Sequence, residues 1–204
     1  GMTFTILTAG IDLSIGSVLA FTGILLSGFI THMPRTTAVL LTVVITTVVV
    51  GGVNGLLIGK LGLNSFVVTL GTLGIFRGIS YLVTNGTTRS MDTGTLINTL
   101  GDGNFGPVPG PLLVVIVVAG ISIWALRSTY FGRDVYAVGG NEFAARLAGV
   151  FTSRVKMTVY FISAFLAALA GIMQVGRLQS AAPTAGAGIE LAVVAGVLLG
   201  GTRL

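Results

Sequence analysis

Three long windows of the sequence carry no charged side chain, and they limit the folds that this chain can adopt. They run from Thr36 to Gly59, from Gly103 to Leu126 and from Met157 to Gly176. Each is close to the roughly 20 apolar residues that an α-helix needs to cross a bilayer. Charged residues make up only 8% of the chain, whereas a soluble domain has about 25%. The sequence therefore predicts an integral membrane protein.

The 31 glycines favour closely packed, interrupted helices over a β-barrel, which needs strands of alternating polarity. We predict an all-α, polytopic helical membrane protein with about six hydrophobic segments. The whole chain, 1–204, is expected to form a single transmembrane domain that is part of a longer protein. The expected segments are 2–30, 36–59, 65–84, 112–126, 157–176 and one that begins near 189.

An acidic motif occurs twice, once near each end of the chain. Residues 9–17 read Ala-Gly-Ile-Asp-Leu-Ser-Ile-Gly-Ser, and residues 187–191 read Ala-Gly-Ile-Glu-Leu. A carboxylate within an apolar segment is costly in hydrocarbon, so Asp12 and Glu190 are expected to face protein or water. The first segment is too long for one straight crossing, and it either tilts or breaks around Gly10 to Gly16. The repeat suggests two related halves.

Five residues are candidates for a structural break or a translocation pathway. An acid at the start of a half-helix can accept free backbone N–H groups and meets the positive end of the helix dipole. The same carboxylate could instead bind a solute. Arg77 lies inside the third segment, where it could pair with an acid, line a polar path or extend to the surface. The candidates are Asp12, Ser14, Gly16, Arg77 and Glu190.

The distribution of basic residues predicts the orientation of the chain. Residues 127–156 hold five of the eleven basic residues and only two acids, so the positive-inside rule places this connection in the cytoplasm and 85–111 outside. The first and last segments then run in opposite directions, as in an inverted repeat, which is a pointer to a transport pathway. Inside would be Lys60, Arg127, Arg133, Arg146, Arg154 and Lys156, and outside Arg35, Arg89 and Arg177.

The connection contains one clear helix signal. Asn141 is a good N-cap, Glu142 suits the first turn and Gly149 suits the C-terminal cap. Phe143 and Leu147 are four residues apart and share one face of the predicted helix 142–148. Such a helix could dock into a groove of another protein or lie at the membrane interface.

Enzymatic functions find no support in the sequence. One histidine and no cysteine leave no multi-histidine or thiolate metal site. There is no H-E-x-x-H or G-x-S-x-G motif, and Gly59-Lys60 lacks the spacing of a phosphate-binding loop. We expect no metal, no cofactor and no nucleic-acid partner. An intramembrane enzyme and a passive channel are the alternatives from other classes.

Ordered motifs span nearly the whole chain, at 10–17, 66–71, 77–78, 131–133, 136–141, 144–150, 190–191 and 200–202. Together they resemble the permease subunit of ribose-type sugar ABC importers. The resemblance implies a multi-pass subunit of the bacterial inner membrane that carries a monosaccharide, with a nucleoside or a branched-chain amino acid as alternatives. It implies four partners: a second permease subunit, a cytoplasmic ATP-binding subunit that hydrolyses ATP, an extracytoplasmic sugar-binding protein and membrane lipid. Glu142-Phe143 departs from the family's usual pair before the double alanine.

Within that resemblance, residues 127–156 are the cytoplasmic coupling loop. The residues implied to couple to the ATPase are Asn141, Glu142, Phe143, Ala144, Ala145, Arg146, Leu147 and Gly149.

Overall fold

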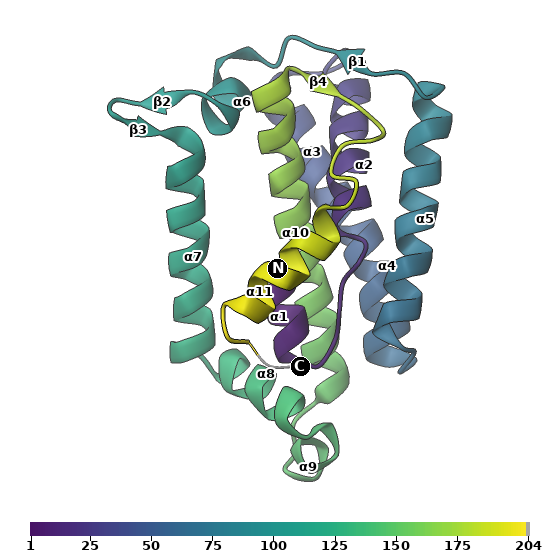
Figure 1. The fold of residues 1–204 in the computed structure, drawn as a ribbon, viewed down its shortest axis with the longest axis vertical. Helices are drawn as coiled ribbons and strands as arrows, with labels where there is room; N and C mark the ends of the chain where they lie inside the picture. Colours follow the sequence, from purple (N-terminus) through teal and green to yellow (C-terminus); the bar gives the residue numbers. More distant parts are fainter. Residues whose placement is uncertain (203–204) are drawn as a thin grey trace.

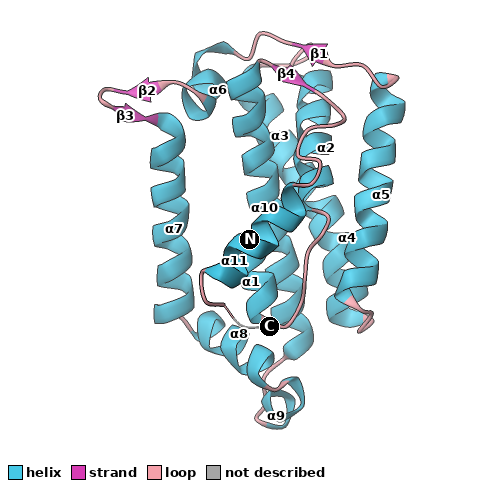
Figure 2. Ribbon diagram, in the orientation of Figure 1, coloured by secondary structure: helices cyan, strands magenta, loops and turns pink. Residues whose placement is uncertain are grey.

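The computed structural model describes residues 1–202 as a bundle of helices with short connections at both ends (Figures 1 and 2). Four helices in this range are long and apolar enough to span a membrane: 35–60, 65–84, 110–128 and 152–178. The α-helices are α1 (Met2–Leu7), α2 (Ile15–Phe29), α3 (Arg35–Thr46), α4 (Gly52–Asn54), α5 (Ser65–Thr84), α6 (Gly94–Gly101), α7 (Gly110–Ser128), α8 (Tyr130–Gly140), α9 (Glu142–Leu147), α10 (Thr152–Leu178) and α11 (Ile189–Leu199).

Two stretches of π-helix and four two-residue strands complete the elements. The π-helical stretches are η1 (Thr47–Gly51) and η2 (Gly55–Lys60), which join α3 and α4 into one continuous span. The strands pair as two small antiparallel ladders at the end of the bundle that carries α6 (Figure 2). The ladders are β1 (Arg89–Ser90) with β4 (Ser180–Ala181), and β2 (Asn104–Phe105) with β3 (Val108–Pro109).

The first expected segment is interrupted, as one of its two predicted forms required. α1 packs toward the α8 end of the bundle, and the chain then returns as a non-helical stretch, 8–14, before α2 continues to the opposite end (Figure 1). Packing against α10 confirms this path, because Gly1 lies beside Ser163, Gly10 beside Tyr160 and Gly23 beside Val175. α1 and α2 therefore run in opposite directions, and the segment is not one helix with a kink.

The glycine ridge of the second span packs against α10. A Cβ on Gly51 would lie 2.9 Å from the Phe161 Cα, and one on Gly55 would lie 3.2 Å from the Met157 carbonyl oxygen. On Gly59 it would lie 2.6 Å from the Met157 Cγ and 2.8 Å from the Ser153 carbonyl oxygen. The absence of side chains therefore lets the two backbones approach closely.

This contact makes a testable prediction. Gly59→Val should lower the melting temperature of the full-length protein in detergent, because overpacking a tight contact costs about 1–3 kcal/mol. Gly74→Val is the matched control, since a Cβ on Gly74 meets nothing within 4 Å and both changes place the same β-branched residue in a helix. Equal melting temperatures for the two variants would contradict the close approach.

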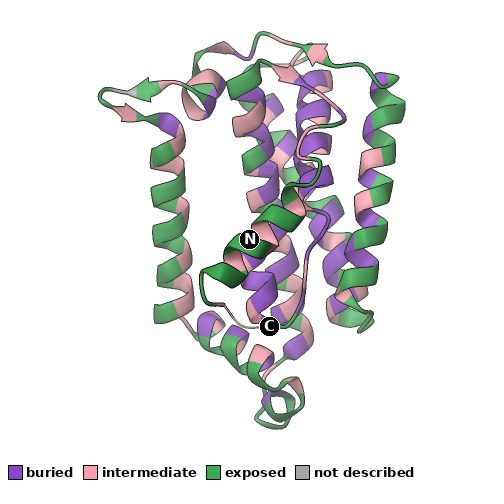
Figure 3. Ribbon diagram, viewed as in Figure 1, coloured by how far each residue is buried: buried purple, intermediate pink, exposed green. Residues whose placement is uncertain are grey.

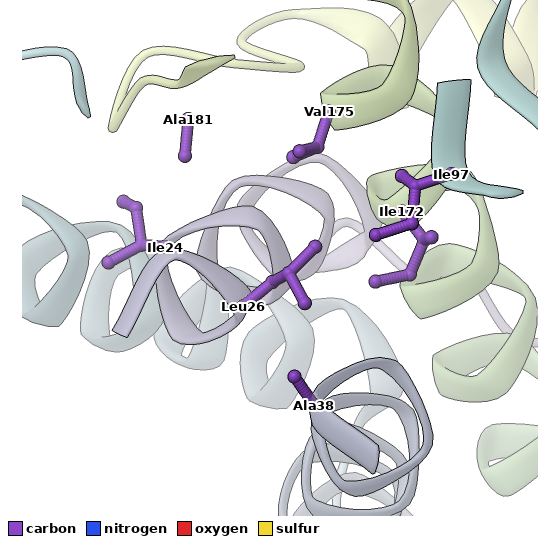
Figure 4. Close-up of a cluster of buried hydrophobic side chains, with 7 residues drawn as sticks. All are labelled: Ile24, Leu26, Ala38, Ile97, Ile172, Val175 and Ala181. Carbon is purple, nitrogen blue, oxygen red and sulfur yellow. The ribbon is translucent and has the colours of Figure 1, made fainter. Parts of the chain in front are cut away.

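Helix α10 lies at the centre of the bundle and carries most of the core. It packs against α2, α3, η1, η2 and α6. Its small residues Ala164, Ala167, Ala168 and Gly171 face the bundle interior. One core cluster joins α2, α3, α6, α10 and β4 (Figure 4), and it consists of Ile24, Leu26, Ala38, Ile97, Ile172, Val175 and Ala181.

Two expectations for the connections need correction. Residues 130–140 form helix α8, which the sequence analysis did not predict, and α10 begins at Thr152, so the last five residues of 127–156 are helical. The connection 85–111 contains helix α6, which docks on α10 and buries Ile97. Glycines made these two helices hard to predict, because glycine lowers helix propensity without excluding a helix. They are Gly132, Gly139 and Gly140 in α8 and Gly94 and Gly101 in α6.

Helices α7 and α11 are the least enclosed elements. α7 makes its main contacts with α6, β3 and α8 near its two ends, and its central turns are exposed (Figure 3). α11 has no buried residue. In a bilayer these apolar faces would meet lipid or other helices rather than water.

Candidate functional site

Two helix N-termini meet in the middle of the bundle, at the two copies of the acidic motif. α2 begins at Ile15 and α11 at Ile189, and the two helices run from this point toward opposite ends (Figure 1). Gly16 lies against the carbonyl oxygen of Gly186 and Oε2 of Glu190, so that any Cβ at Gly16 would collide with both. The opposite directions agree with the predicted inverted pair. The sequence repeat is therefore also a spatial contact.

Asp12 is the centre of a buried hydrogen-bond network. The residue is only 2% exposed. Its Oδ1 accepts the Ser14 N–H at 3.0 Å and the Ser14 hydroxyl at 2.5 Å, and its Oδ2 accepts the Ser163 hydroxyl at 2.6 Å. Asn54 Nδ2 donates to Ser14 Oγ at 3.1 Å. These hydrogen bonds connect the non-helical stretch to Asn54 in the second span and to Ser163 in α10.

The two acids serve the two N-termini in a similar way. Asp12 accepts the amide of Ser14, the N-cap residue of α2. Glu190 Oε1 accepts the amide of Gly188, the N-cap residue of α11, at 3.3 Å. Each carboxylate thus accepts a hydrogen bond from the amide of the N-cap residue itself, rather than from the amides of the first turn. Both lie where a helix dipole favours negative charge.

Side chains of α5 satisfy backbone groups of the non-helical stretch 8–14. Ser65 Oγ accepts the N–H of Ile11 at 3.3 Å. Thr69 Oγ1 accepts the N–H of Leu13 at 3.1 Å and lies 3.2 Å from the carbonyl oxygen of Ile11. Irregular backbone at membrane depth is tolerated only where protein or water satisfies its polar groups. The α5 hydroxyls provide that compensation.

Arg77 contacts the loop before α11 and neither acid. Its Nη1 donates to the carbonyl oxygens of Pro183 at 2.6 Å and Ala185 at 2.7 Å. Of the predicted alternatives, an ion pair with Asp12 or Glu190 is absent from the described residues. The guanidinium instead positions the loop that leads into the second half-helix. Five donors in a fixed plane suit this bridging of two carbonyls.

The predicted coupling residues form an exposed helix at the opposite end from α6. Asn141 Oδ1 accepts the Ala144 N–H at 2.9 Å and caps α9, and Gly149 follows with a φ of 88°. Glu142 is held by Lys156 at 2.6 Å and by Arg146 at 3.4 Å. The Lys156 hydrogen bond holds the pKa of Glu142 below its usual value, so the carboxylate is ionised at neutral pH.

The remaining residues of α9 present an apolar surface. Phe143 is 72% exposed and Leu147 is 75% exposed, whereas Ala145 is buried against the rest of the bundle. Ala144 and Arg146 are exposed. Two large apolar side chains that point away from the molecule are costly in water, which favours a covered state.

The sequence singled out Asp12, Ser14, Gly16 and Glu190 as candidates for the break. It did not indicate the residues that form hydrogen bonds with this region. Asn54 received no specific role, although it is 1% exposed and bonded to Ser14. The other missed residues are Ser65, Thr69 and Ser163. Ser65 and Thr69 lie four residues apart on one helix face, a spacing that could have suggested a common target. Ser163 had no comparable signal.

The Asp12 network predicts different outcomes for two substitutions. Asp12→Asn retains an oxygen for Ser14, and the Ser163 hydroxyl can turn to accept from the new amide. Asp12→Ala leaves the Ser14 N–H and two hydroxyls buried without this acceptor, at a cost of about 1–3 kcal/mol for each unsatisfied group. We expect Asp12→Asn to melt near the parent temperature in detergent and Asp12→Ala to melt clearly lower. Equal melting of both variants would show that the network adds no stability.

These features define the class of protein. Apolar spans, an unwound stretch satisfied by neighbouring helices and charged residues at the bundle ends belong to a polytopic helical membrane protein. The family of branched-chain amino acid transport system / permease component proteins matches residues 1–204. The chain belongs to that family, and it is a multi-pass protein of the bacterial inner membrane.

The relatives confirm the resemblance drawn from the motifs. Ribose import permease protein RbsC of Bacillus subtilis is 41% identical over 206 residues and that of Haemophilus influenzae is 39% identical over 207, with 100% of this chain and 64% of each relative covered. The L-arabinose ABC transporter permease protein AraH of Azospirillum brasilense is 34% identical over 203 residues, with 60% of its length covered. The chain thus spans less than two thirds of these relatives. No solved structure matches it.

Proposed function

We propose that this chain is the core of the transmembrane subunit of an ATP-driven importer that moves a monosaccharide of the pentose class into the bacterial cell. The observation that supports it most is the meeting of two oppositely directed half-helices at Gly16, Gly186 and Glu190. Such inverted, interrupted helices commonly form solute pathways in transporters. The names of the relatives, which specify ribose and arabinose import, suggest the solute.

The pathway in this proposal runs beside the break. The Asp12 network fixes one half-helix, and Arg77 positions the loop before the other. Ser14, Gly16 and Glu190 lie where the halves touch. A contact made by two half-helices can open without unfolding either one. Residues 1–204 would form one transmembrane domain around this contact.

The partners in this proposal follow from the two ends of the bundle. One end carries Lys60, Glu142, Arg146, Arg154 and Lys156, which line a common surface hollow. We assign this end to the cytoplasm, where α9 would dock into a separate ATP-binding subunit that hydrolyses ATP. The other end would meet an extracytoplasmic sugar-binding protein. The exposed apolar helix faces would meet lipid and a second permease subunit.

A reconstitution experiment tests this function. The full-length protein, its ATPase and its binding protein would be placed in liposomes, and uptake of radiolabelled ribose would be followed with and without ATP. We expect uptake that requires ATP and the binding protein. ATP-independent uptake that runs down the gradient would identify a passive channel instead.

A branched-chain amino acid is the second candidate solute, because the description of the matching family names it. Excess unlabelled ribose or leucine in the same assay separates the two. Competition by leucine, together with ATP-dependent leucine uptake and no ribose uptake, would replace the sugar in this proposal. Uridine in a third arm tests a nucleoside.

A further inference from the structure

A polar cavity of about 210 Å³ lies beside the non-helical stretch 8–14, at the α8–α9 end of the bundle. It is bounded by the turn after α1, the end of η2, the loop before α5 and the first turns of α10. At the density of liquid water this volume corresponds to about seven molecules, which is also the scale of one monosaccharide. The residues that matter here are Thr8, Ala9, Gly10, Ser65, Lys156 and Tyr160.

The hydroxyl of Tyr160 is the most informative group in the lining. The side chain is 1% exposed and packs with Ile58 and Val68, yet its hydroxyl has no hydrogen-bond partner within the described residues. A Cβ on Gly10 would lie 2.7 Å from this oxygen. A side chain at this position would therefore collide with the hydroxyl, which lies behind Gly10 at the wall of the cavity. An unsatisfied buried hydroxyl costs about 1–3 kcal/mol, which a bound hydroxyl group would recover.

The turn next to Tyr160 supplies acceptors. The carbonyl oxygens of Thr8, Ala9 and Gly10 accept no hydrogen bond from the part of the chain that the structure describes. Ala9 has a φ of 55°, a left-handed conformation that is unusual for a residue with a side chain. Ser65 Oγ accepts the Ile11 N–H, and a serine hydroxyl can also donate its own hydrogen. The cavity therefore combines free acceptors with hydroxyl donors.

The charge of the lining favours a neutral ligand over an anionic one. Lys156 is the only charged residue in it. Its ammonium group is already paired with Glu142 at 2.6 Å. A phosphate or carboxylate would therefore find no free cation, whereas a neutral polyhydroxyl compound could bond to the hydroxyls and carbonyls together.

We propose that this cavity is a binding site for a neutral polyol, with Tyr160 as its central hydroxyl partner. The inference rests on the proposed function, in which the cavity would hold the sugar on its way out at the α8–α9 end. It adds a second solute contact that is separate from the half-helix contact at Gly16. Tyr160 and Ser65 then bond to the solute through their hydroxyls, and Gly10 leaves the space that a side chain would fill. Lys156 adds no net charge, because it is paired with Glu142.

Protection of an introduced cysteine tests the site. Leu63 lines the cavity and is 48% exposed, and the described chain contains no cysteine. Leu63→Cys would be made in the full-length protein, free of other cysteines and assembled with its ATPase in nucleotide-free detergent solution. Ribose should slow labelling by a thiol reagent several-fold, and inorganic phosphate should not. Adding Tyr160→Phe should raise the ribose concentration for half protection about three- to tenfold.

The matched control is Tyr81→Phe, which removes the same hydroxyl from an exposed position on α5 and should leave protection unchanged. Absence of protection by ribose, equal protection by phosphate, or an unchanged value in Tyr160→Phe would each overturn the polyol site. Ribose uptake by the same protein in liposomes is measured in parallel. Uptake without protection refutes this site alone, and protection without ATP-dependent uptake refutes the importer while supporting the site.

Discussion

Gly16→Ala in the full-length importer should reduce ATP-dependent ribose uptake roughly tenfold or more, the equivalent of about 1.4 kcal/mol. The added methyl group would collide with the Gly186 carbonyl oxygen and with Glu190 Oε2, where the two half-helices meet. Overpacking such a contact costs about 1–3 kcal/mol. Alanine is otherwise the better helix former by about 1 kcal/mol, so a loss of uptake cannot come from a weaker helix.

Gly28→Ala is the control for this prediction. Gly28 lies on the same helix α2, and a Cβ there meets nothing within 4 Å. Membrane level and ATPase assembly should match the parent protein in both variants, so that uptake alone distinguishes them. Normal uptake by Gly16→Ala at normal protein level would mean that the contact of the two half-helices is not part of the pathway.

The double variant Phe143→Asp/Leu147→Asp should lose co-purification of the ATPase while it still inserts in the membrane. Both side chains are more than 70% exposed, and burial of each in a partner groove would contribute about 1.5–3 kcal/mol. Aspartate removes this gain and would place an unpaired charge in the groove. Affinity purification of the tagged permease, followed by measurement of the bound ATPase, gives the result.

Leu96→Asp is the control for the coupling helix. Leu96 is 54% exposed on α6, at the opposite end of the bundle, so its replacement should leave ATPase binding intact. Retention of the ATPase and of full uptake by the α9 double variant would favour the alternative in which α9 lies at the membrane interface.

The order of apolar and polar residues was sufficient to predict the membrane class and the third span. Ser65–Thr84 is a helix with the predicted bounds, because hydrocarbon demands an uninterrupted helical run and Asn64 caps its start. The ridge Gly51, Gly55 and Gly59 faces α10, since residues four apart share one helix face. These properties depend on neighbours along the chain.

Tertiary structure alone decided how the acidic motif is held. Asp12 bonds Ser163, 151 residues away, and Asn54 bonds Ser14, 40 residues away. Arg77 reaches the carbonyl oxygens of Pro183 and Ala185 rather than a carboxylate. Hydrogen bonds form only between atoms about 3 Å apart, so these partners depend on which helices pack together. The sequence by itself determined that the acids must be satisfied, and the packing of α5 and α10 determined by which groups.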